Sequence, residues 1–406
     1  MSALNEPVTD AARVAAIAAA ISEAPLATFD LEFLAQDRLV PTLCLVQVSW
    51  LGKDTRLDVP AAVIVTTPPE VALIDPLAVD VRPVVEALAA HPCVVAHAPR
   101  QDLGLLATRF GIAMPAVIDT QVMAAFAGIG DQVGLATLAN ELLDLGLGKE
   151  LQWTDWARRP LSEAQLAYAD ADVRHLPAIF ALLRHRLGER VAWARAESAQ
   201  VAADAVAAAE VTPETAWQQL GGLRNLDTTA LATAIALAAW RLHAAIELDR
   251  PLGQVLHEKV LLDLARQRPT SPAALRAVKG VSAIVKQRAD DVIAAIVGAK
   301  AESAPVLASM RSASQRAQRW SEMLLAIVQL VADQVRVAPR LLATRADAEE
   351  FARVFDERGR TGAGALPALA TWRRDVIGQV WVDWLEGRLA LLGDPASPAG
   401  IQLLPR

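Results

Sequence analysis

Cysteine, histidine and tyrosine are scarce in this chain, and the first two shortages each exclude a class of protein. Only two cysteines occur in 406 residues, Cys44 and Cys93, and both lie in apolar runs. Two thiols cannot cross-link a chain of this length, so a disulfide-stabilised scaffold is excluded and a reducing cytosol is the simplest setting. The six histidines form no zinc-ligand spacing, which excludes a histidine-based zinc site.

Long apolar runs and an excess of basic charge are also missing. No stretch of about 18 residues is apolar and free of charge, and the N-terminus lacks the basic start of a signal peptide. We therefore expect a cytoplasmic protein with no membrane contact. The net charge of −7 argues against nucleic-acid binding by the whole surface.

The charge is unevenly distributed along the chain. Residues 241–300 carry ten Lys or Arg against six Asp or Glu, a local excess of +4, so the remainder sums to −11. This separation fits a nuclease that gathers carboxylates in one domain and binds phosphates with another.

Strand and helix signals alternate in the first part of the chain. Short apolar or β-branched runs predict strands. The early ones follow each other closely, which favours antiparallel pairing, whereas the later ones are separated by helical patterns, which favours parallel crossovers. A mixed sheet flanked by helices is therefore expected. The predicted strands are 26–33, Thr42–Trp50, 62–65, 71–74 and 93–96, and the predicted helices are 81–90 and 102–110.

From about residue 161 onward the patterns predict helices only. Helical spacing runs from 162 to 183 after a capping signal, and an Ala- and Glu-rich helical connector covers 190–210. We expect helices to the end of the chain, with a loosely held tail after 393. The predicted domains are 1–205, 214–302 and 316–392.

Asp30 and Glu32 are the first candidate functional residues. Residues two apart in a strand point to the same face, so both carboxylates project from an otherwise apolar strand. Burying two carboxylates together is unfavourable unless a cation neutralises them. A solvent-facing strand end is the competing interpretation.

Two more candidates lie further along the chain. Asp102 follows the strand that ends near His97, where α/β sheets place ligands, although a helix cap would also explain it. Tyr168, the chain's one tyrosine, and Asp172 are four residues apart and share a helix face. Asp170 is expected to face solvent or to act as a cap partner. His97 is expected to be structural.

Together, these signals resemble the ribonuclease D family of the DEDD exonuclease superfamily. The order is Asp-x-Glu, then a helical Asp, then Tyr-x-x-x-Asp. The resemblance covers about residues 12–190. Ala167 stands where one branch of the family has histidine, so Tyr168 places the chain in the tyrosine branch. The segments that match are 41–47, 74–76, 97–103, 118–121, 155–156, 159–162 and 165–173.

Two positions depart from the family pattern. Leu31 stands where threonine is usual, but that side chain is expected to face away from the metals. Trp153 stands where arginine is common, in a loop that begins at Lys149, which puts one phosphate contact in question.

The helical region resembles the HRDC domain, a module shared by helicases and ribonuclease D. The resemblance is carried by 237–241, 262–265, 269–272 and 279–282. A second, more diverged copy is expected at 316–392, in which Trp372 corresponds to Trp240. Both tryptophans are expected to pack in the core, while basic side chains meet phosphates: Arg241, Lys259, Lys279, Lys286 and Arg288.

The resemblance implies a ribonuclease H-like α/β exonuclease domain followed by all-α HRDC-type domains. It implies two Mg²⁺ or Mn²⁺ ions held by Asp30, Glu32, Asp102 and Asp172, with Tyr168 orienting the attacking water. The expected activity is 3′→5′ exoribonuclease action by a monomer that releases nucleoside 5′-monophosphates from RNA with a single-stranded 3′ end, transfer-RNA precursors in particular. The alternatives are a DNA 3′→5′ exonuclease, a non-catalytic RNA-binding protein and a helicase-associated factor.

Overall fold

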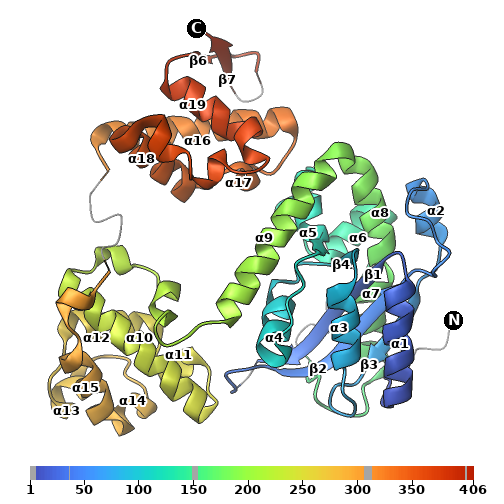
Figure 1. Ribbon diagram of the computed structural model, residues 1–406, viewed down its shortest axis with the longest axis horizontal. Helices are drawn as coiled ribbons and strands as arrows, with labels where there is room; N and C mark the ends of the chain where they lie inside the picture. The colour runs from blue at the N-terminus through green and yellow to red at the C-terminus, as the bar shows by residue number, and fades with distance from the viewer. Residues whose placement is uncertain (1–5, 36, 149–153, 306–312, 398–399) are drawn as a thin grey trace.

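The computed structural model describes residues 6–35, 37–148, 154–305, 313–397 and 400–406. Its first part is built on a five-stranded sheet in the order β3-β2-β1-β4-β5 (Figure 1). Strand β1 pairs antiparallel with β2 and parallel with β4, so the predicted mixed sheet is confirmed. The strands are β1 Ala27–Leu34, β2 Thr42–Trp50, β3 Glu70–Ile74, β4 Val94–Ala96 and β5 Val117–Asp119.

Helices cover both faces of this sheet. Alternate residues of β1, such as Phe29 and Leu31, pack into an apolar core with α1 and α3. The intervening residues of β1 face α7, which contacts the first three strands. The helices of this part are α1 Ala11–Glu23, α2 Ala61–Thr66, α3 Arg82–Ala90, α4 Arg100–Phe110, α5 Thr120–Phe126, α6 Leu135–Leu143, α7 Glu163–Arg174, α8 Leu176–Leu187 and α9 Val191–Ala209.

Three predictions for this part were wrong in detail. The apolar run 62–65 is helix α2, because four apolar residues do not distinguish a strand from a helix turn. Only Ile64 of this helix is buried. The predicted helix 162–183 is two helices that break at His175, two residues before Pro177. The three-residue strand β5 was missed: its two apolar residues are followed directly by Asp119, so no apolar run stands out in the sequence.

A helical bundle follows the long helix α9 and lies to the lower left in Figure 1. Its central helix, α10, is long and apolar enough by composition to cross a bilayer, but 61% of that apolar stretch is buried in the bundle. Packing against the other helices therefore accounts for its composition. The helices are α10 Thr228–Leu248, α11 Leu252–Val255, α12 Glu258–Gln267, α13 Pro272–Ala277, α14 Ala283–Gln287 and α15 Ala289–Gly298.

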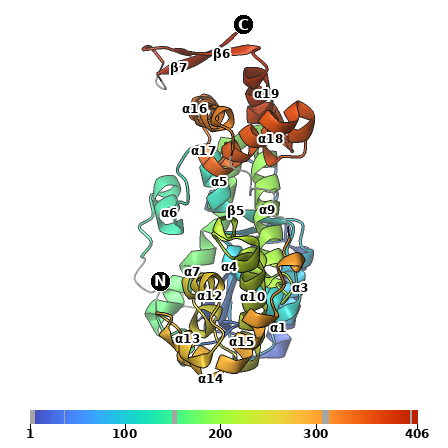
Figure 2. The ribbon, with the colours of Figure 1, turned by 90° about the vertical axis from the view of Figure 1, so that its left-hand side faces the viewer.

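A third unit packs directly on the domain that contains the five-stranded sheet, beside α5 and α9 (Figure 2). One apolar core includes Phe126 and Phe180 of the sheet domain together with Trp372 and Trp381 of this unit. The unit ends in a β-hairpin, so the expectation of helices to the end and a loose tail was wrong. Its elements are α16 Gln315–Val335, α17 Pro339–Leu342, α18 Arg345–Ala363, α19 Gln379–Leu385, β6 Leu389–Gly393 and β7 Ile401–Pro405.

Candidate active site

Strand β1 presents two carboxylates on the face that is covered by α7. Asp30 pairs with Gln47 and Glu32 with Leu45 across the β1–β2 ladder. Leu31, between the two acids, is 5% exposed and packs in the core on the opposite face, as its position predicts. The replacement of threonine by leucine at this position therefore leaves the carboxylate face unchanged.

Helix α7 is fixed at both ends. At its start, the Ser162 hydroxyl accepts from the Gln165 amide while the Gln165 side chain accepts from the Ser162 amide, a capping box. Near its end, the Val173 carbonyl accepts from Ser49 on β2 at 3.0 Å. Since both ends are anchored, the face that carries Tyr168 and Asp172 is held over β1.

Asp102 lies in the first turn of α4, just beyond the end of β4, and is 8% exposed. The turn that leads into α4 is held by Asp119, which accepts from the Ala98 amide at 2.9 Å and from the Gln121 amide at 2.7 Å. Ala98 has a left-handed φ of 51°, a conformation that needs such support. Asp119 therefore places α4, and with it Asp102, at the site.

Three of the predicted carboxylates converge. Oxygen atoms of Asp30, Glu32 and Asp172 all lie within 4.8 Å of one another. Asp102 is outside this three-residue group, yet it is electrostatically coupled to it, because its charge raises the pKa of Glu32. Hard oxygen ligands in such a cluster suit Mg²⁺ or Mn²⁺.

Burial and mutual repulsion disfavour the ionised form of every acid in the cluster. Burial raises the pKa of Asp30 to about 7, and burial with the charge of Asp30 raises the pKa of Asp172 to about 8. Burial and three neighbouring carboxylates raise the pKa of Glu32 to about 9. The pKa of Asp102 is also raised, mainly by burial. A bound cation would remove this repulsion, so these residues fit a metal site.

The phenol of Tyr168 and the carboxylate of Asp172 are neighbours on one face of α7 and affect each other's pKa. Burial and the charges of Asp172, Glu32 and Asp30 raise the pKa of the phenol, so the hydroxyl keeps its proton at neutral pH. Asp170, on the same helix, forms an ion pair with Arg174 at 2.5 Å and is largely buried. The expectation that Asp170 faces solvent or caps the helix was therefore wrong.

His97 lies beside the site without joining the acidic cluster. Its Nδ1 is 2.9 Å from the Thr120 hydroxyl, and burial lowers its pKa to about 4. A ring that stays neutral and hydrogen-bonded agrees with the structural role predicted for it. Lys149 and Trp153, the loop residues in question, lie outside the described residues.

The five basic side chains predicted to meet phosphates differ in their surroundings, and Arg288 is partly buried and paired with Glu247 at 2.6 Å. Lys259, Lys279 and Lys286 are exposed, as expected for phosphate contacts. Arg241 is 6% exposed, donates to the Leu256 carbonyl, and has a pKa lowered by burial. The expectation that Arg241 meets phosphates was wrong, because it lies on the buried side of α10.

Sequence reasoning also missed residues that support the site from behind. Asp119 and Ser49 belong to otherwise apolar strands, so no spacing rule singled them out. The side chain of Gln47, next to Asp30, is fully buried, and neither its amide oxygen nor its nitrogen has a hydrogen-bond partner among the described residues. The signal that could have found these three is a polar residue inside an apolar run.

Comparisons with known proteins agree with this architecture. A family model described as 3′-5′ exonuclease matches residues 5–188, and the HRDC domain model matches residues 231–296. Ribonuclease D of Granulibacter bethesdensis is 33% identical over 95% of this chain and 93% of that protein. Ribonuclease D of Jannaschia sp. is 32% identical, over 95% and 96%.

A solved structure shows the same arrangement. Escherichia coli RNase D, described as an exoribonuclease involved in structured RNA processing, superposes with a TM-score of 0.77 at 25% identity. The match covers 94% of this chain and 98% of that one. The fold class predicted from the sequence is confirmed, and an exonuclease of this fold implies divalent metal ions, for which the acidic cluster is present. With these matches over nearly its whole length, the chain belongs to the ribonuclease D family of 3′→5′ exoribonucleases.

Proposed function

We propose that Asp30, Glu32, Asp102 and Asp172 hold two divalent metal ions, Mg²⁺ or Mn²⁺, and that Tyr168 orients the attacking water. The observation that carries this proposal is the convergence of three carboxylates within 4.8 Å, with every acid of the cluster held at a raised pKa. When bound, such ions would lower the pKa of a bound water molecule and stabilise the charge on the attacking and leaving oxygens during in-line displacement at phosphorus.

The residues of the chain then have separate tasks. Tyr168 stays protonated beside Asp172, and the lone pairs of its oxygen can accept a hydrogen bond from water. It acts as a neutral orienting group, because a phenol with a raised pKa is a poor base at neutral pH. Attack at the terminal phosphodiester breaks the bond to the 3′ oxygen and releases a nucleoside 5′-monophosphate.

We propose as substrate RNA with a single-stranded 3′ end, and transfer-RNA precursors in particular, processed by a cytoplasmic monomer. The role of Escherichia coli RNase D in structured RNA processing supports this. Exposed Lys259, Lys279 and Lys286 on the helical bundle would contact the phosphates of the folded part of the RNA. The domain limits 1–205, 214–302 and 316–392, and the second HRDC-like copy, remain predictions.

The test is stepwise 3′ trimming of a labelled transfer-RNA precursor with Mg²⁺ or Mn²⁺, beside a DNA strand of matched sequence. Asp172→Asn should be inert, whereas Asp170→Asn should trim normally, because Asp170 lies on the same helix but pairs with Arg174. Equal trimming of the DNA would overturn the RNA preference and keep the site assignment. An active Asp172→Asn would overturn the site assignment itself.

A further inference from the structure

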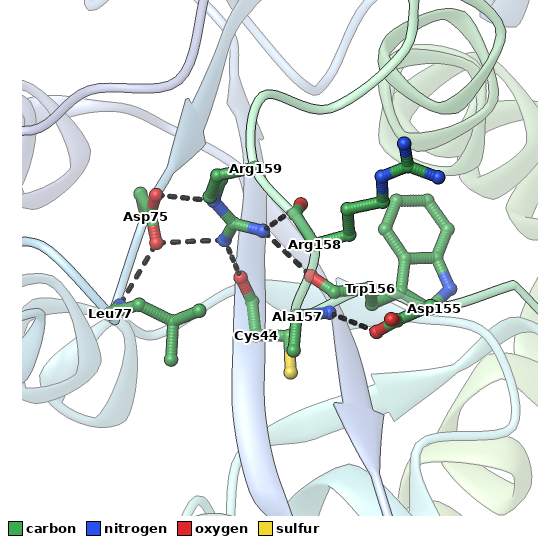
Figure 3. A network of polar contacts seen from close by, with 8 residues as sticks. All are labelled: Cys44, Asp75, Leu77, Asp155, Trp156, Ala157, Arg158 and Arg159. Carbon is green, nitrogen blue, oxygen red and sulfur yellow. Dashed lines mark hydrogen bonds and ion pairs between the residues drawn. The ribbon is translucent and has the colours of Figure 1, made fainter.

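The side chain of Arg159 forms hydrogen bonds to three separate segments of the exonuclease domain (Figure 3). Its Nε and one Nη donate hydrogen bonds to the two carboxylate oxygens of Asp75, at 2.6 and 2.8 Å. The remaining N–H groups donate to the carbonyls of Cys44 at 2.6 Å, Trp156 at 2.7 Å and Arg158 at 3.0 Å. All five donors of the guanidinium are therefore used, which fixes its position.

One of these segments is a β-bulge beside a carboxylate of the site. Glu32 pairs with Leu45 on β2, but the next residue, Phe33, pairs with Leu43. Cys44 is therefore the extra residue of the bulge, and its carbonyl accepts from Arg159 at 2.6 Å. Bulges redirect neighbouring side chains, so Arg159 holds the local shape of the strands next to Glu32.

A second segment is the loop that carries Trp156. This side chain is 1% exposed and packs in an apolar cluster with Cys44 and Leu45. Tyr168 packs against the same cluster, with its ring centroid 6.1 Å from that of Trp156. Because Arg159 holds the Trp156 carbonyl, it holds the indole against Tyr168.

The third segment is the end of β3, which supplies the counter-charge. Asp75 is 7% exposed on its side chain and also accepts from the Leu77 amide at 2.9 Å. A bidentate pair of this kind has a preferred geometry, unlike a solvated surface contact. Asp75 therefore anchors Arg159 to the sheet rather than to the loop alone.

We propose that the Arg159–Asp75 pair is a positioning device that sets Tyr168 relative to the strand carrying Glu32. In the described part of the chain, no hydrogen bond or ion pair joins Arg159 or Asp75 to the four acidic residues of the site, and the pair acts on hydrolysis through Trp156 and the bulge at Cys44. This inference rests on the proposed role of Tyr168 as the residue that orients water. A displaced phenol would misalign that water, and displacements of about 1 Å can lower rates on the order of 10²-fold.

The first measurement separates kcat from KM on a short unstructured RNA. Arg159→Met and Asp75→Asn should each lower kcat by about 10- to 100-fold and leave KM within about two-fold. Arg159→Lys keeps the positive charge but lacks the planar guanidinium that donates to several acceptors at once. Its kcat should therefore lie between that of Arg159→Met and the wild type. Arg353→Met is the control, because Arg353 is a comparably covered, ion-paired arginine in α18, outside the exonuclease domain.

The second measurement observes Tyr168 directly. Since the chain has a single tyrosine, incorporation of 3-fluorotyrosine gives one ¹⁹F resonance, which reports on Tyr168 alone. Arg159→Met and Asp75→Asn should shift or broaden this resonance, and Arg353→Met should leave it unchanged. Asp75→Asn preserves the size of its side chain, so it keeps the test valid if Arg159→Met fails to fold.

A double-mutant comparison with Tyr168→Phe separates the two proposals. If Arg159 acts through Tyr168, Arg159→Met should lower kcat by less than about three-fold in the Tyr168→Phe background. A full and additive loss there, or an unchanged kcat in both Arg159→Met and Asp75→Asn, overturns the positioning role while the site assignment stands. A fully active Tyr168→Phe overturns the role of Tyr168 and this inference with it.

Discussion

Individual carboxylates of the site oppose folding in the absence of a metal ion. Each must lose solvent and lie beside like charges, which is why the pKa of Glu32 rises to about 9 and that of Asp172 to about 8. In the unfolded chain the same groups titrate near 4. The metal-free folded protein therefore binds more protons than the unfolded chain between about pH 4 and 9.

This difference predicts how stability depends on pH. Because the folded protein binds protons more tightly at these groups, proton binding stabilises it relative to the unfolded chain. This stabilisation is complete below about pH 4 and is lost as pH rises through the folded pKa values of about 7, 8 and 9. In EDTA, the melting temperature should fall between pH 6 and pH 9. Added Mg²⁺ should restore it, and most strongly at pH 9, where the carboxylates are already ionised.

Asp172→Asn is the matched comparison for that measurement. It removes one titrating carboxylate from the cluster, so its melting temperature in EDTA should fall less steeply with pH than that of the wild type. It should also gain less from Mg²⁺, because one oxygen ligand is neutral. Identical pH profiles for the two proteins would show that the cluster does not control the stability of the metal-free protein.

At the scale of single elements, α7 is the critical helix, because it brings Tyr168 and Asp172 to β1. It is a short helix, and its capping box satisfies amides that would otherwise lack partners. The hydroxyls of Thr28 and Ser49 hold its last turn through the Val173 carbonyl. The position of both site residues therefore depends on contacts outside their own side chains.

Ser162→Ala should lower the free energy of unfolding by about 1 kcal/mol, because it removes one half of the capping box. Chemical denaturation would measure this change. Ser271→Ala is the matched control, since the Ser271 hydroxyl also accepts from a backbone amide, that of Ala274, at the start of α13 in the helical bundle. Ser162→Ala should make activity on a short RNA more sensitive to temperature, and Ser271→Ala should not. Equal sensitivity in both variants would contradict the role assigned to α7.

At the scale of the whole molecule, the two helical units are attached to the exonuclease domain by different forces. The HRDC bundle meets the β1–β2 loop mainly through polar contacts, including Arg38–Asp249 at 2.8 Å and Gln254–Asp37 at 3.0 Å, beside one apolar contact from Leu39. Both side chains of the Arg38–Asp249 pair are about half exposed, so solvent and salt screen their attraction. The position of the bundle should therefore depend on salt.

The third unit is attached through buried aromatic rings instead. Trp372 stacks on Trp193 with 5.3 Å between ring centroids. It also packs edge-on against Phe126, with 5.1 Å between ring centroids. Arg373 pairs with Glu197 at 2.7 Å beside them. Gly128 adopts a left-handed φ of 70°, and a Cβ there would come within 3.2 Å of the Arg336 carbonyl. The contact is therefore close-packed.

Trp372→Ala should lower the free energy of unfolding by about 3–5 kcal/mol, the usual cost of emptying an aromatic site in a core. Calorimetry should then resolve separate transitions for the exonuclease domain and the third unit. Trp320→Ala is the control, because Trp320 packs on Phe355 within the third unit alone. A single cooperative transition in Trp372→Ala would contradict the view that this ring couples the two units.

The sequence by itself determined the local pattern of the site. A period of two placed Asp30 and Glu32 on one face of a strand, and a spacing of four placed Tyr168 and Asp172 on one face of a helix. These regularities follow from backbone geometry, which needs no knowledge of the fold. The order of the motifs also indicated the family, and with it the exonuclease and HRDC architecture.

Only the tertiary structure decided which of these residues meet and what holds them. Asp119 and Arg159 act through hydrogen bonds to segments 21 to 115 residues away in sequence, and no local period reports such contacts. The burial of Arg241 and the shared core of Trp193 and Trp372 depend on how helices pack. Spacing along the chain predicts the face on which a side chain lies, but the neighbours of that face are set by packing between distant segments.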